Sequence, residues 1–427
     1  MRERILIIGS GGREHAIAFS LSQSPNCEAL FVAPGNAGTS EIAMNLDLSV
    51  SDFSAIGIAC EQHNITMVVV GPEVPLVEGI VNYFQKSPSL STLKVIGPDQ
   101  LAATLEGSKD FAKAFMAKHG VRTAAYATFT KENLQEGMAF LDGLNGPYVL
   151  KADGLAAGKG VLILEDLEEA KQKLNAFLSE DLFGQAGSKV VIEDFLDGIE
   201  CSCFVAIDAN YNYKVLPFAK DYKRIGEQDT GLNTGGMGAV SPVDFVDETL
   251  YNRIEHEIVI PTVEGIKREG YAYVGFVFIG LMIVNGTPYV IEYNVRMGDP
   301  ETEVVFPLIT SDTVDLFDAM SEGTLDTYTL TIKPGYAVTV IAVSKGYPEA
   351  YDKGKRIDGL GGPYESAVYH AGTASKNDIV VSNGGRVLAV TSFGETLQQS
   401  LDKSYTTLKK VGFEEMYYRK DIGKDLM

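Results

Sequence analysis

A short apolar segment that runs straight into a glycine turn and a helix constrains the fold of this chain more than any other feature. Residues 4–9 (RILIIG) suit a strand buried on both faces, Ser10-Gly11-Gly12 follows, and a helix is expected from Arg13 to about Gln23. Such a strand is typical of a parallel sheet with helices on both faces. Further apolar segments predict strands at 30–32, 67–70 and 95–96. We therefore expect residues 1–105 to form a doubly wound α/β domain.

The loops after these strands are candidates for ligand binding, because ligands of open α/β sheets bind beyond the carboxyl ends of the strands. The turn GSGGRE differs from the dinucleotide pattern G-x-G-x-x-G, since Glu14 stands at the third glycine position. It favours a phosphate or phosphosugar at the helix start over a nicotinamide cofactor. Residues 34–38, 71–73 and 97–98 form similar loops, although α/β loops are often rich in Gly and Pro without binding a ligand.

A loop of small residues flanked by lysines predicts a site for nucleotide phosphates. The expected strand 148–151 ends in Lys151, residues 152–160 read ADGLAAGKG with Lys159 near the tip, and a second strand is expected at 161–164. Loop N–H groups and lysines can neutralise phosphate charge. The Walker pattern is absent, and a strand rather than a helix follows. Lys109, at the start of an expected helix, is either another phosphate ligand or a surface residue.

A strand expected at 190–196 runs into a connector that could serve as a nucleotide hinge. Its backbone can meet an adenine edge, Phe195 or Leu196 can supply an apolar contact, and Glu200 can accept hydrogen bonds from ribose hydroxyls. An ordinary sheet strand explains the same residues equally well.

A glycine-rich segment later in the chain suggests a second ligand loop. A charged cluster at 221–224 precedes a long loop, expected from Gly226 to Pro242, that contains NTGGMG. Structureless loops of this length are usually functional or disordered.

The segment 289–303 (YVIEYNVRMGDPETE) combines a strand with several charged side chains. Residues 275–283 and 289–294 should form a hairpin, because Asn285-Gly286 between them is a strong turn signal. Glu292 and Asn294 are two apart and share one face of the strand. Their oxygens suit a Mg²⁺ ion that also contacts substrate phosphates. Taken alone, however, such a short pattern is more often a polar strand end.

Composition narrows the classes of protein that fit. The net charge of −21 argues against non-specific binding to nucleic acid or anionic membranes. The four cysteines lack zinc spacing, so we expect free thiols in a reducing, cytoplasmic compartment. No apolar segment approaches the ~20 residues needed to span a bilayer, and the first residues do not resemble a signal peptide. Residues 331–427 read as a small α+β domain.

Nine sequence blocks in order resemble the glycinamide ribonucleotide synthetase (phosphoribosylamine–glycine ligase) family of the ATP-grasp superfamily. The blocks are GGREHA at 11–16, APGNAGT at 33–39, GPEVPLV at 71–77, LEGSK at 105–109, KADGLAAGKG at 151–160, NTGGMGA at 233–239, RMGDPETE at 296–303, HAGT at 370–373 and NGGRV at 383–387. The resemblance implies an N-terminal α/β domain (1–105), an ATP-grasp domain (106–330) with a mobile lid at about 123–195, and a C-terminal α+β domain (331–427).

The resemblance also implies a reaction in which ATP, glycine and 5-phosphoribosylamine give glycinamide ribonucleotide, ADP and phosphate through glycyl phosphate, in purine biosynthesis. A cytoplasmic monomer using Mg²⁺ or Mn²⁺ is expected. Implied metal ligands are Glu292 and Asn294, and implied catalytic residues are Arg296, Asp299, Glu301 and Lys159. The implied ATP site comprises Lys109, Lys151, Gly154, Leu155, Ala156, Ala157, Gly158, Lys159, Gly160, Glu193, Phe195, Leu196 and Glu200. The implied substrate site comprises Gly11, Gly12, Arg13, Glu14, Gly35, Asn36, Pro72, Glu73, Asp221, Lys223, Asn233, Gly235, Gly236, Met237 and Arg296.

Several positions depart from the family pattern. Tyr222, Met297, Glu303 and Ser382 stand where histidine, phenylalanine, glutamine and threonine are common, and residues 280–282 (GLM) carry no carboxylate next to the metal strand. None of these changes removes a charge expected at the ligands. Three alternatives remain: another ATP-grasp carboxylate–amine ligase, a non-catalytic nucleotide-binding protein, and a nicotinamide oxidoreductase suggested by the first glycine turn alone.

Overall fold

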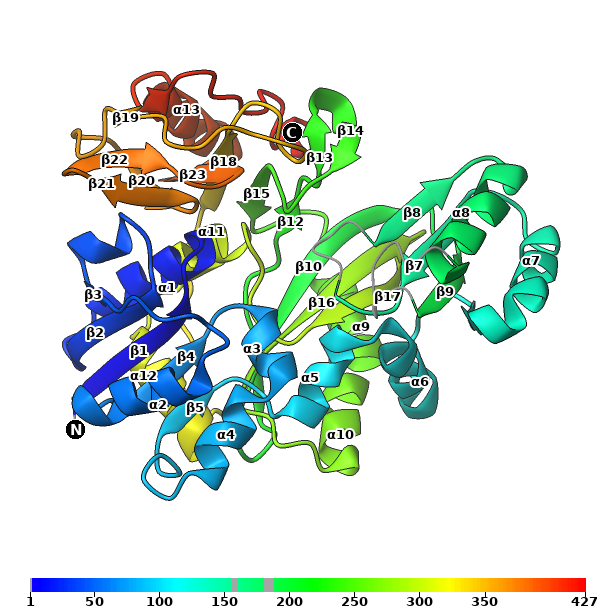
Figure 1. The fold of residues 1–427 in the computed structure, drawn as a ribbon, viewed down its shortest axis with the longest axis horizontal. Helices are drawn as coiled ribbons and strands as arrows, with labels where there is room; N and C mark the ends of the chain where they lie inside the picture. The colour runs from blue at the N-terminus through cyan, green and yellow to red at the C-terminus, as the bar shows by residue number, and fades with distance from the viewer. Residues whose placement is uncertain (1, 156–159, 180–187) are drawn as a thin grey trace.

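The computed structural model describes residues 2–155, 160–179 and 188–427, and its elements are shown in Figure 1. The N-terminal sheet has the order β3-β2-β1-β4-β5, and all of its strands are parallel. Its strands are β1 (Glu3–Gly9), β2 (Cys27–Pro34), β3 (Met44–Asn45), β4 (Met67–Val70) and β5 (Lys94–Ile96). The prediction of a doubly wound parallel sheet is confirmed.

Alternate residues of β1 enter two different cores, as a strand buried on both faces requires. Ile5 and Ile7 pack with α1 (Gly12–Ser22) and α12 (Thr313–Glu322). Leu6 and Ile8 pack with α2 (Phe53–Gln62) and α4 (Ile80–Lys86). One helical layer of the N-terminal sheet is therefore completed by a helix from much later in the chain.

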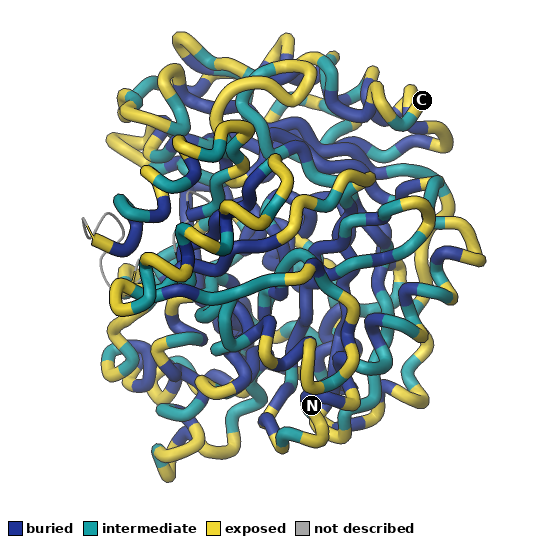
Figure 2. The backbone as a smooth tube through the Cα atoms, turned by 90° about the vertical axis from the view of Figure 1, so that its right-hand side faces the viewer, coloured by how far each residue is buried: buried dark blue, intermediate teal, exposed yellow. Residues whose placement is uncertain are grey.

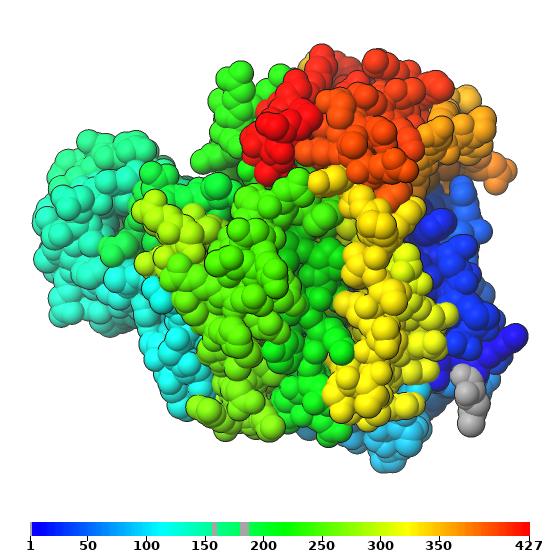
Figure 3. All heavy atoms as spheres, turned by 180° about the vertical axis from the view of Figure 1, so that it is seen from behind, coloured from blue at the N-terminus to red at the C-terminus, as the bar shows by residue number. Residues whose placement is uncertain are grey.

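Two antiparallel sheets make up the middle of the molecule. The order in one is β6-β9-β7-β8, and helices α7 (Leu134–Asp142) and α8 (Leu167–Ser179) pack on it as a projecting lobe (Figures 1 and 3). Its strands are β6 (Tyr126–Thr130), β7 (Tyr148–Ala152), β8 (Val161–Leu164) and β9 (Lys189–Asp194). The order in the other is β11-β10-β16-β17, with β10 (Ile199–Ile207), β11 (Tyr213–Val215), β16 (Gly275–Val284) and β17 (Thr287–Asn294).

The β16–β17 hairpin carries an irregularity just before its functional residues. Asn285 and Gly286 both have positive φ, at 48° and 73°, as the predicted Asn-Gly turn requires. Gly280 lies opposite Glu292 but Leu281 lies opposite Val290, so Ile291 is the extra residue of a β-bulge. The bulge leaves the carbonyl of Ile291 free for a partner outside the ladder.

The prediction of a structureless loop from Gly226 to Pro242 is wrong. This segment contains the hairpin of β13 (Arg224–Gly226) and β14 (Thr230–Asn233), followed by β15 (Gly238–Ser241). β15 and β12 (Lys220–Asp221) extend the C-terminal sheet, whose order is β12-β15-β18-β23-β20. This pairing could not be predicted from the glycine-rich segment itself, because the partner strand β18 lies about a hundred residues further along the chain.

The C-terminal sheet is formed mainly by β18 (Tyr336–Val343), β20 (Ser366–His370) and β23 (Arg386–Gly394), with α13 (Leu397–Leu408) packed on it. The C-terminal part also contains two separate two-stranded sheets. One pairs β21 (Thr373–Lys376) with β22 (Ile379–Ser382), and the other pairs β19 (Ile357–Asp358) with β24 (Gly412–Phe413).

The remaining helices are α3 (Glu73–Glu78), α5 (Gln100–Gly107), α6 (Lys109–His119), α9 (Glu248–Ile254), α10 (Ile260–Glu269) and α11 (Thr302–Val305). A π-helical turn, Glu255–Val259, joins α9 to α10, so the two helices form one continuous but irregular helix. Figure 2 shows the buried strands running through the interior. Within the described ranges, no helix has the length and apolar character to cross a membrane.

Removing a ring from the core between the N-terminal sheet and α12 should destabilise the protein. Phe317 is 0% exposed and packs edge-on against Phe276 and Phe306. Phe317→Ala should lower the free energy of unfolding by about 3–5 kcal/mol, seen as a lower urea midpoint. Ile332→Ala, at a side chain 41% exposed, is the control and should change the midpoint far less. Equal midpoints for Phe317→Ala and the wild type would contradict this packing.

Candidate active site

Arg296 is the centre of a buried ion network where β17 ends. Its Nη2 lies 2.6 Å from Glu106 Oε1 on α5 and donates to Asn294 Oδ1 at 3.0 Å. Its Nε lies 3.3 Å from Glu73 Oε2 at the start of α3. Glu106 also accepts a hydrogen bond from Val295 N. Arg296 and Glu73 were predicted site residues, whereas Glu106 was not, although it stands in the LEGSK block.

The two carboxylates of this network differ in their electrostatic environment. Burial raises the pKa of Glu106 to about 7, because it outweighs the attraction of Arg296 and is helped by the charge of Glu73. Burial alone would also raise the pKa of Glu73, but Arg296 and Arg13 hold it below its usual value. Arg296 is thus paired at neutral pH with at least one full negative charge.

Glu292 is a partly buried carboxylate held in its ionised form. Burial opposes ionisation, but Lys223, Lys151 and Lys109 together lower the pKa of Glu292. Asn294, the second predicted metal ligand, leaves its buried Nδ2 without a hydrogen-bond partner. An ionised carboxylate beside an amide oxygen fits a hard cation such as Mg²⁺.

The protein supplies few ligands to such a cation. Gly280 lies directly across from Glu292, as the sequence anticipated, so β16 adds no carboxylate there. Among the described residues, no group of three or more His, Cys, Asp and Glu side chains could hold a metal ion. This donor set suits Mg²⁺ bound largely by substrate phosphates and water.

The predicted phosphate-binding lysines lie close to Glu292. Lys109 Nζ donates to Gly154 O at 3.2 Å, and burial together with Lys151 lowers the pKa of Lys109 despite the nearby Glu292. Lys151 Nζ lies 2.9 Å from Glu193 Oε1 and donates to Ile291 O at 3.1 Å. Leu155 and Gly160 border the loop. The predicted residues Ala156, Ala157, Gly158 and Lys159 lie outside the described residues.

The expected hinge divides into an exposed and a buried part. Phe195 is 38% exposed and is therefore open to an apolar ligand contact, and Leu196 is partly exposed. Glu193 is 3% exposed and turns inward to Lys151 and Lys113. Glu200 forms an ion pair with Lys223, so two residues predicted for different ligands neutralise each other here.

The first glycine turn, which the sequence predicts to bind a phosphate or phosphosugar, is bordered by carboxylates and by the Arg13 guanidinium. Gly11 N donates to Glu14 Oε2 at 2.6 Å, and Glu14 Oε1 lies 2.6 Å from Arg13 Nε. Asp299 faces Gly11, and a Cβ on Gly12 would collide with Glu303. Glu14 is thus paired with Arg13, and the turn carries charges of both signs.

The acids after Gly298 occupy different environments. Asp299 Oδ1 lies 2.9 Å from Arg386 Nη1, which also donates to Gly235 O at 2.6 Å. Glu301 is 3% exposed and accepts a hydrogen bond from Ser202 Oγ at 3.1 Å. Burial raises the pKa of Glu301. Of the two, Asp299 is the one open to a ligand.

Arg386 reaches this cluster from the C-terminal sheet. Arg386 stands in the NGGRV block but was not among the predicted site residues. Asp221 also faces the acids, and burial, with Glu301 and Glu200 opposing Lys223, raises the pKa of Asp221 to about 8.

A cavity of about 670 Å³ opens between the N-terminal and C-terminal sheets. Hydroxyl, amide and backbone groups line it, including Gly35, Asn36, Ser40, Thr373, Ser375 and Asn383. The Asn36 side chain is already used, since Nδ2 donates to Ser10 O and His370 O at 2.8 Å each. Asn36 therefore shapes this cavity more through its backbone than through its amide.

The remaining predicted site residues differ in their burial and in their backbone conformation. Met237 is 0% exposed and packs with Ala16 and Tyr369, so its side chain is not open to substrate. Asn233 is partly exposed. Gly236 has φ 113° beside Pro300, a conformation that suits glycine. Pro72 precedes α3 as its N-cap.

Tyr222, which departs from the family pattern, has a structural role. It is 2% exposed, and its hydroxyl donates to Asp425 Oδ1 at 2.6 Å. It therefore ties β12 to the C-terminal end of the chain.

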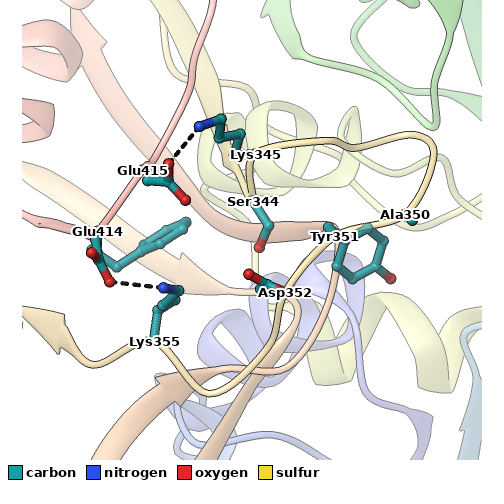
Figure 4. Close-up of a pocket in the computed structure, with 9 residues that line it drawn as sticks. Ser344, Lys345, Ala350, Tyr351, Asp352, Lys355, Glu414 and Glu415 are labelled. Atoms are coloured by element: carbon teal, nitrogen blue, oxygen red, sulfur yellow. Dashed lines mark hydrogen bonds and ion pairs between the residues drawn. The ribbon is translucent and has the colours of Figure 1, made fainter.

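A second cavity, of about 360 Å³, lies in the C-terminal part (Figure 4). Lys345 pairs with Glu415 at 2.5 Å, and Lys355 pairs with Glu414 at 2.7 Å. Its cations are already neutralised by carboxylates on the same wall, and it lies away from the Arg296 network.

Family models match the whole arrangement in three consecutive parts. These are the N domain (residues 3–106), the ATP-grasp (A) domain (107–302) and the C domain (337–425) of phosphoribosylglycinamide synthetase. The chain belongs to the phosphoribosylglycinamide synthetase family. The resemblance stated from the sequence blocks is thereby confirmed, and so is the three-part fold with an ATP-grasp core.

Individual relatives of this family match over nearly their full length. The phosphoribosylamine–glycine ligase of Neisseria meningitidis serogroup B is 46% identical over 98% of both chains, and that of Caldanaerobacter subterraneus is 42% identical over 98% of this chain and 99% of its own. The crystal structure of phosphoribosylamine–glycine ligase from Thermotoga maritima has a TM-score of 0.83 at 38% identity, covering 98% and 99% of the two chains. A biotin carboxylase domain from Hydrogenobacter thermophilus, at 16% identity and a TM-score of 0.75 over 98% and 92% of the two chains, shares the fold.

The buried carboxyl group of Glu303 should make the stability of the protein depend on pH. It is 0% exposed, neither carboxyl oxygen has a hydrogen-bond partner, and burial together with Asp299 raises the pKa of Glu303 well above its usual value. The folded state therefore retains a proton that the unfolded chain loses, so its contribution to stability is lost as pH rises above the unfolded pKa.

Glu303→Gln should remove this loss. Relative to the wild type, the variant should gain up to ~1.4 kcal/mol per pH unit as the pH rises above the unfolded pKa of about 4, measured by urea unfolding at several pH values. Glu365→Gln, at a side chain 76% exposed, serves as the control. A constant difference between Glu303→Gln and the wild type across this range would show that Glu303 is ionised when buried.

Proposed function

We propose that this protein joins glycine to 5-phosphoribosylamine at the expense of ATP, giving glycinamide ribonucleotide, ADP and phosphate in purine biosynthesis. Membership of the family over the whole chain supports this reaction. The structural observation that most supports the reaction is the position of Glu292, an ionised carboxylate held among lysines beside the Arg296 network. Phosphoryl transfer requires this combination of positioned positive charge and a metal ligand.

The first step activates the glycine carboxylate. A carboxylate oxygen attacks the γ-phosphorus of ATP, which forms glycyl phosphate and releases ADP. Lys109, Lys151 and Lys159 hold the phosphates, and Glu292 and Asn294 would hold a Mg²⁺ ion that would supply further positive charge to them. Mn²⁺ is the alternative ion. Phe195, Leu196 and the segment leading to Glu200 receive the adenosine part.

The second step forms the amide bond. The ribosylamine nitrogen attacks the acyl carbon, phosphate leaves with the carboxylate oxygen, and the nitrogen loses a proton. Arg296 orients the carboxylate end of glycine and stabilises charge on the acyl phosphate. Asp299 is better placed than Glu301 to hold the amine, because Glu301 is buried against Ser202. The cavity bordered by Gly35 and Thr373 takes the sugar.

We further propose the division into residues 1–105, 106–330 with a lid at about 123–195, and 331–427, acting as a monomer in the cytoplasm. Two contacts cross these boundaries, since α12 packs on the N-terminal sheet and β15 joins the C-terminal sheet. Both tie the segments around the site together.

ADP release should require both glycine and 5-phosphoribosylamine. This follows because the acyl phosphate forms on glycine and is resolved by the amine. A coupled assay of ADP, with each substrate omitted in turn, measures it. Equal ADP release with another carboxylic acid in place of glycine would instead favour a different ATP-grasp carboxylate–amine ligase.

Glu292→Ala should lower kcat by at least ~100-fold, because the reaction loses a positioned metal ligand. Chelation of divalent ions should abolish wild-type turnover in the same assay, and added Mg²⁺ should restore it. Glu365→Ala, at an exposed carboxylate, should keep wild-type turnover. Normal turnover by Glu292→Ala would contradict the metal assignment.

A further inference from the structure

A buried trio of charges, Lys113, Glu193 and Lys151, lies behind the nucleotide site. Lys113 Nζ is 3.0 Å from Glu193 Oε2, and Lys151 Nζ is 2.9 Å from Glu193 Oε1. The side chains of Lys113 and Glu193 are 2% and 3% exposed, whereas that of Lys151 is 10% exposed. One carboxylate is thus shared by two ammonium groups, and only one of them lies near the surface of the site.

We propose that Lys113, on α6, positions the phosphate-binding Lys151 by neutralising Glu193, so that the charge of Lys151 remains available to a nucleotide. This inference rests on the proposed function, since it assumes that nucleotide phosphates bind at Lys151. Lys113 itself is a positioning residue, because it is buried behind Glu193 and does not line the site. Without Lys113, the full charge of Glu193 would bind Lys151 and compete with the phosphates.

The same trio also fixes the strand that carries the metal ligand. Lys113 Nζ donates to Thr123 Oγ1 at 2.6 Å, and Thr123 Oγ1 donates to Val290 O at 2.6 Å. Lys151 donates to the next carbonyl, Ile291 O, which the β-bulge has released from the ladder. Both lysines are therefore connected to consecutive peptide groups that immediately precede Glu292.

Burial makes the charge of Lys113 sensitive to pH. Burial lowers the pKa of Lys113 to about 8, with Lys151 acting in the same direction and Glu193 against it. The Tyr126 ring lies 5.5 Å from Lys113 Nζ on the remaining side. As pH rises through about 8, Lys113 loses its proton, Glu193 is no longer neutralised by it, and nucleotide binding should weaken. Arginine at this position would keep its charge throughout this range.

The test measures MgADP binding by titration calorimetry on the full chain. Lys113→Met should weaken binding about tenfold or more at pH 7, while the KM for glycine stays within about twofold. Lys113→Arg should bind within about threefold of the wild type and should lose the decline in affinity above about pH 8. Lys118→Met, at an exposed lysine of the same helix that pairs with Glu269, is the matched control and should bind as the wild type does.

A double variant separates charge compensation from loss of packing. If Lys113 acts by neutralising Glu193, Lys113→Met/Glu193→Gln should bind MgADP more tightly than Lys113→Met alone. It also removes the unpaired buried carboxylate that could prevent the single variant from folding. Equal affinity of wild type and Lys113→Met, or no recovery in the double variant, would overturn the inference. If the wild type itself fails to bind MgADP, the proposed nucleotide site is wrong and this inference falls with it.

Discussion

The guanidinium of Arg296 connects parts of the chain that would otherwise have no reason to meet. Its partners come from α3, α5 and the end of β17. Removing a charged side chain from water is costly unless charged partners and hydrogen bonds replace the water. Glu73, Glu106 and Asn294 supply these charged partners and hydrogen bonds. They thereby hold the N-terminal domain against β17, the strand that carries Glu292 and Asn294.

The other charged side chains of the site are likewise paired with groups of opposite charge. Lys223 is paired with Glu200, Lys151 with Glu193, and Arg386 with Asp299. A chain with a net charge of −21 can receive anionic ATP only where cations gather, and Lys223, Lys151 and Lys109 gather around Glu292. At the first glycine turn, Arg13 pairs with Glu14 and Arg386 pairs with Asp299, so charges of both signs are neutralised there as well.

Local sequence patterns predicted much of this architecture. The apolar segment 4–9, the Asn285-Gly286 turn and the alternation of Glu292 with Asn294 each depend on residues within a few positions of one another, and each appears in the structure as expected. The order of the nine family blocks predicted the three-part fold. These features could be read because strand burial, turn geometry and the two-residue period are local properties.

Contacts between distant segments could not be read in this way. The residues around Glu106 do not indicate its contact with Arg296, and those around Lys113 do not indicate its contact with Glu193. In the same way, nothing near Gly238 indicates that it pairs with Val340. Asp299 and Glu303 lie beside the first glycine turn, although they stand almost three hundred residues away in the sequence. The electrostatics of such a local motif depend on tertiary contacts that its own residues do not reveal.

The central claim is that the glycine carboxylate is activated by phosphorylation within this site. Glycine labelled with ¹⁸O in its carboxylate tests it directly, because the oxygen that attacks ATP must leave with phosphate when the amine attacks. Mass spectrometry of the inorganic phosphate formed in a complete reaction should find one ¹⁸O atom per molecule. Unlabelled phosphate, formed alongside glycinamide ribonucleotide, would contradict the account.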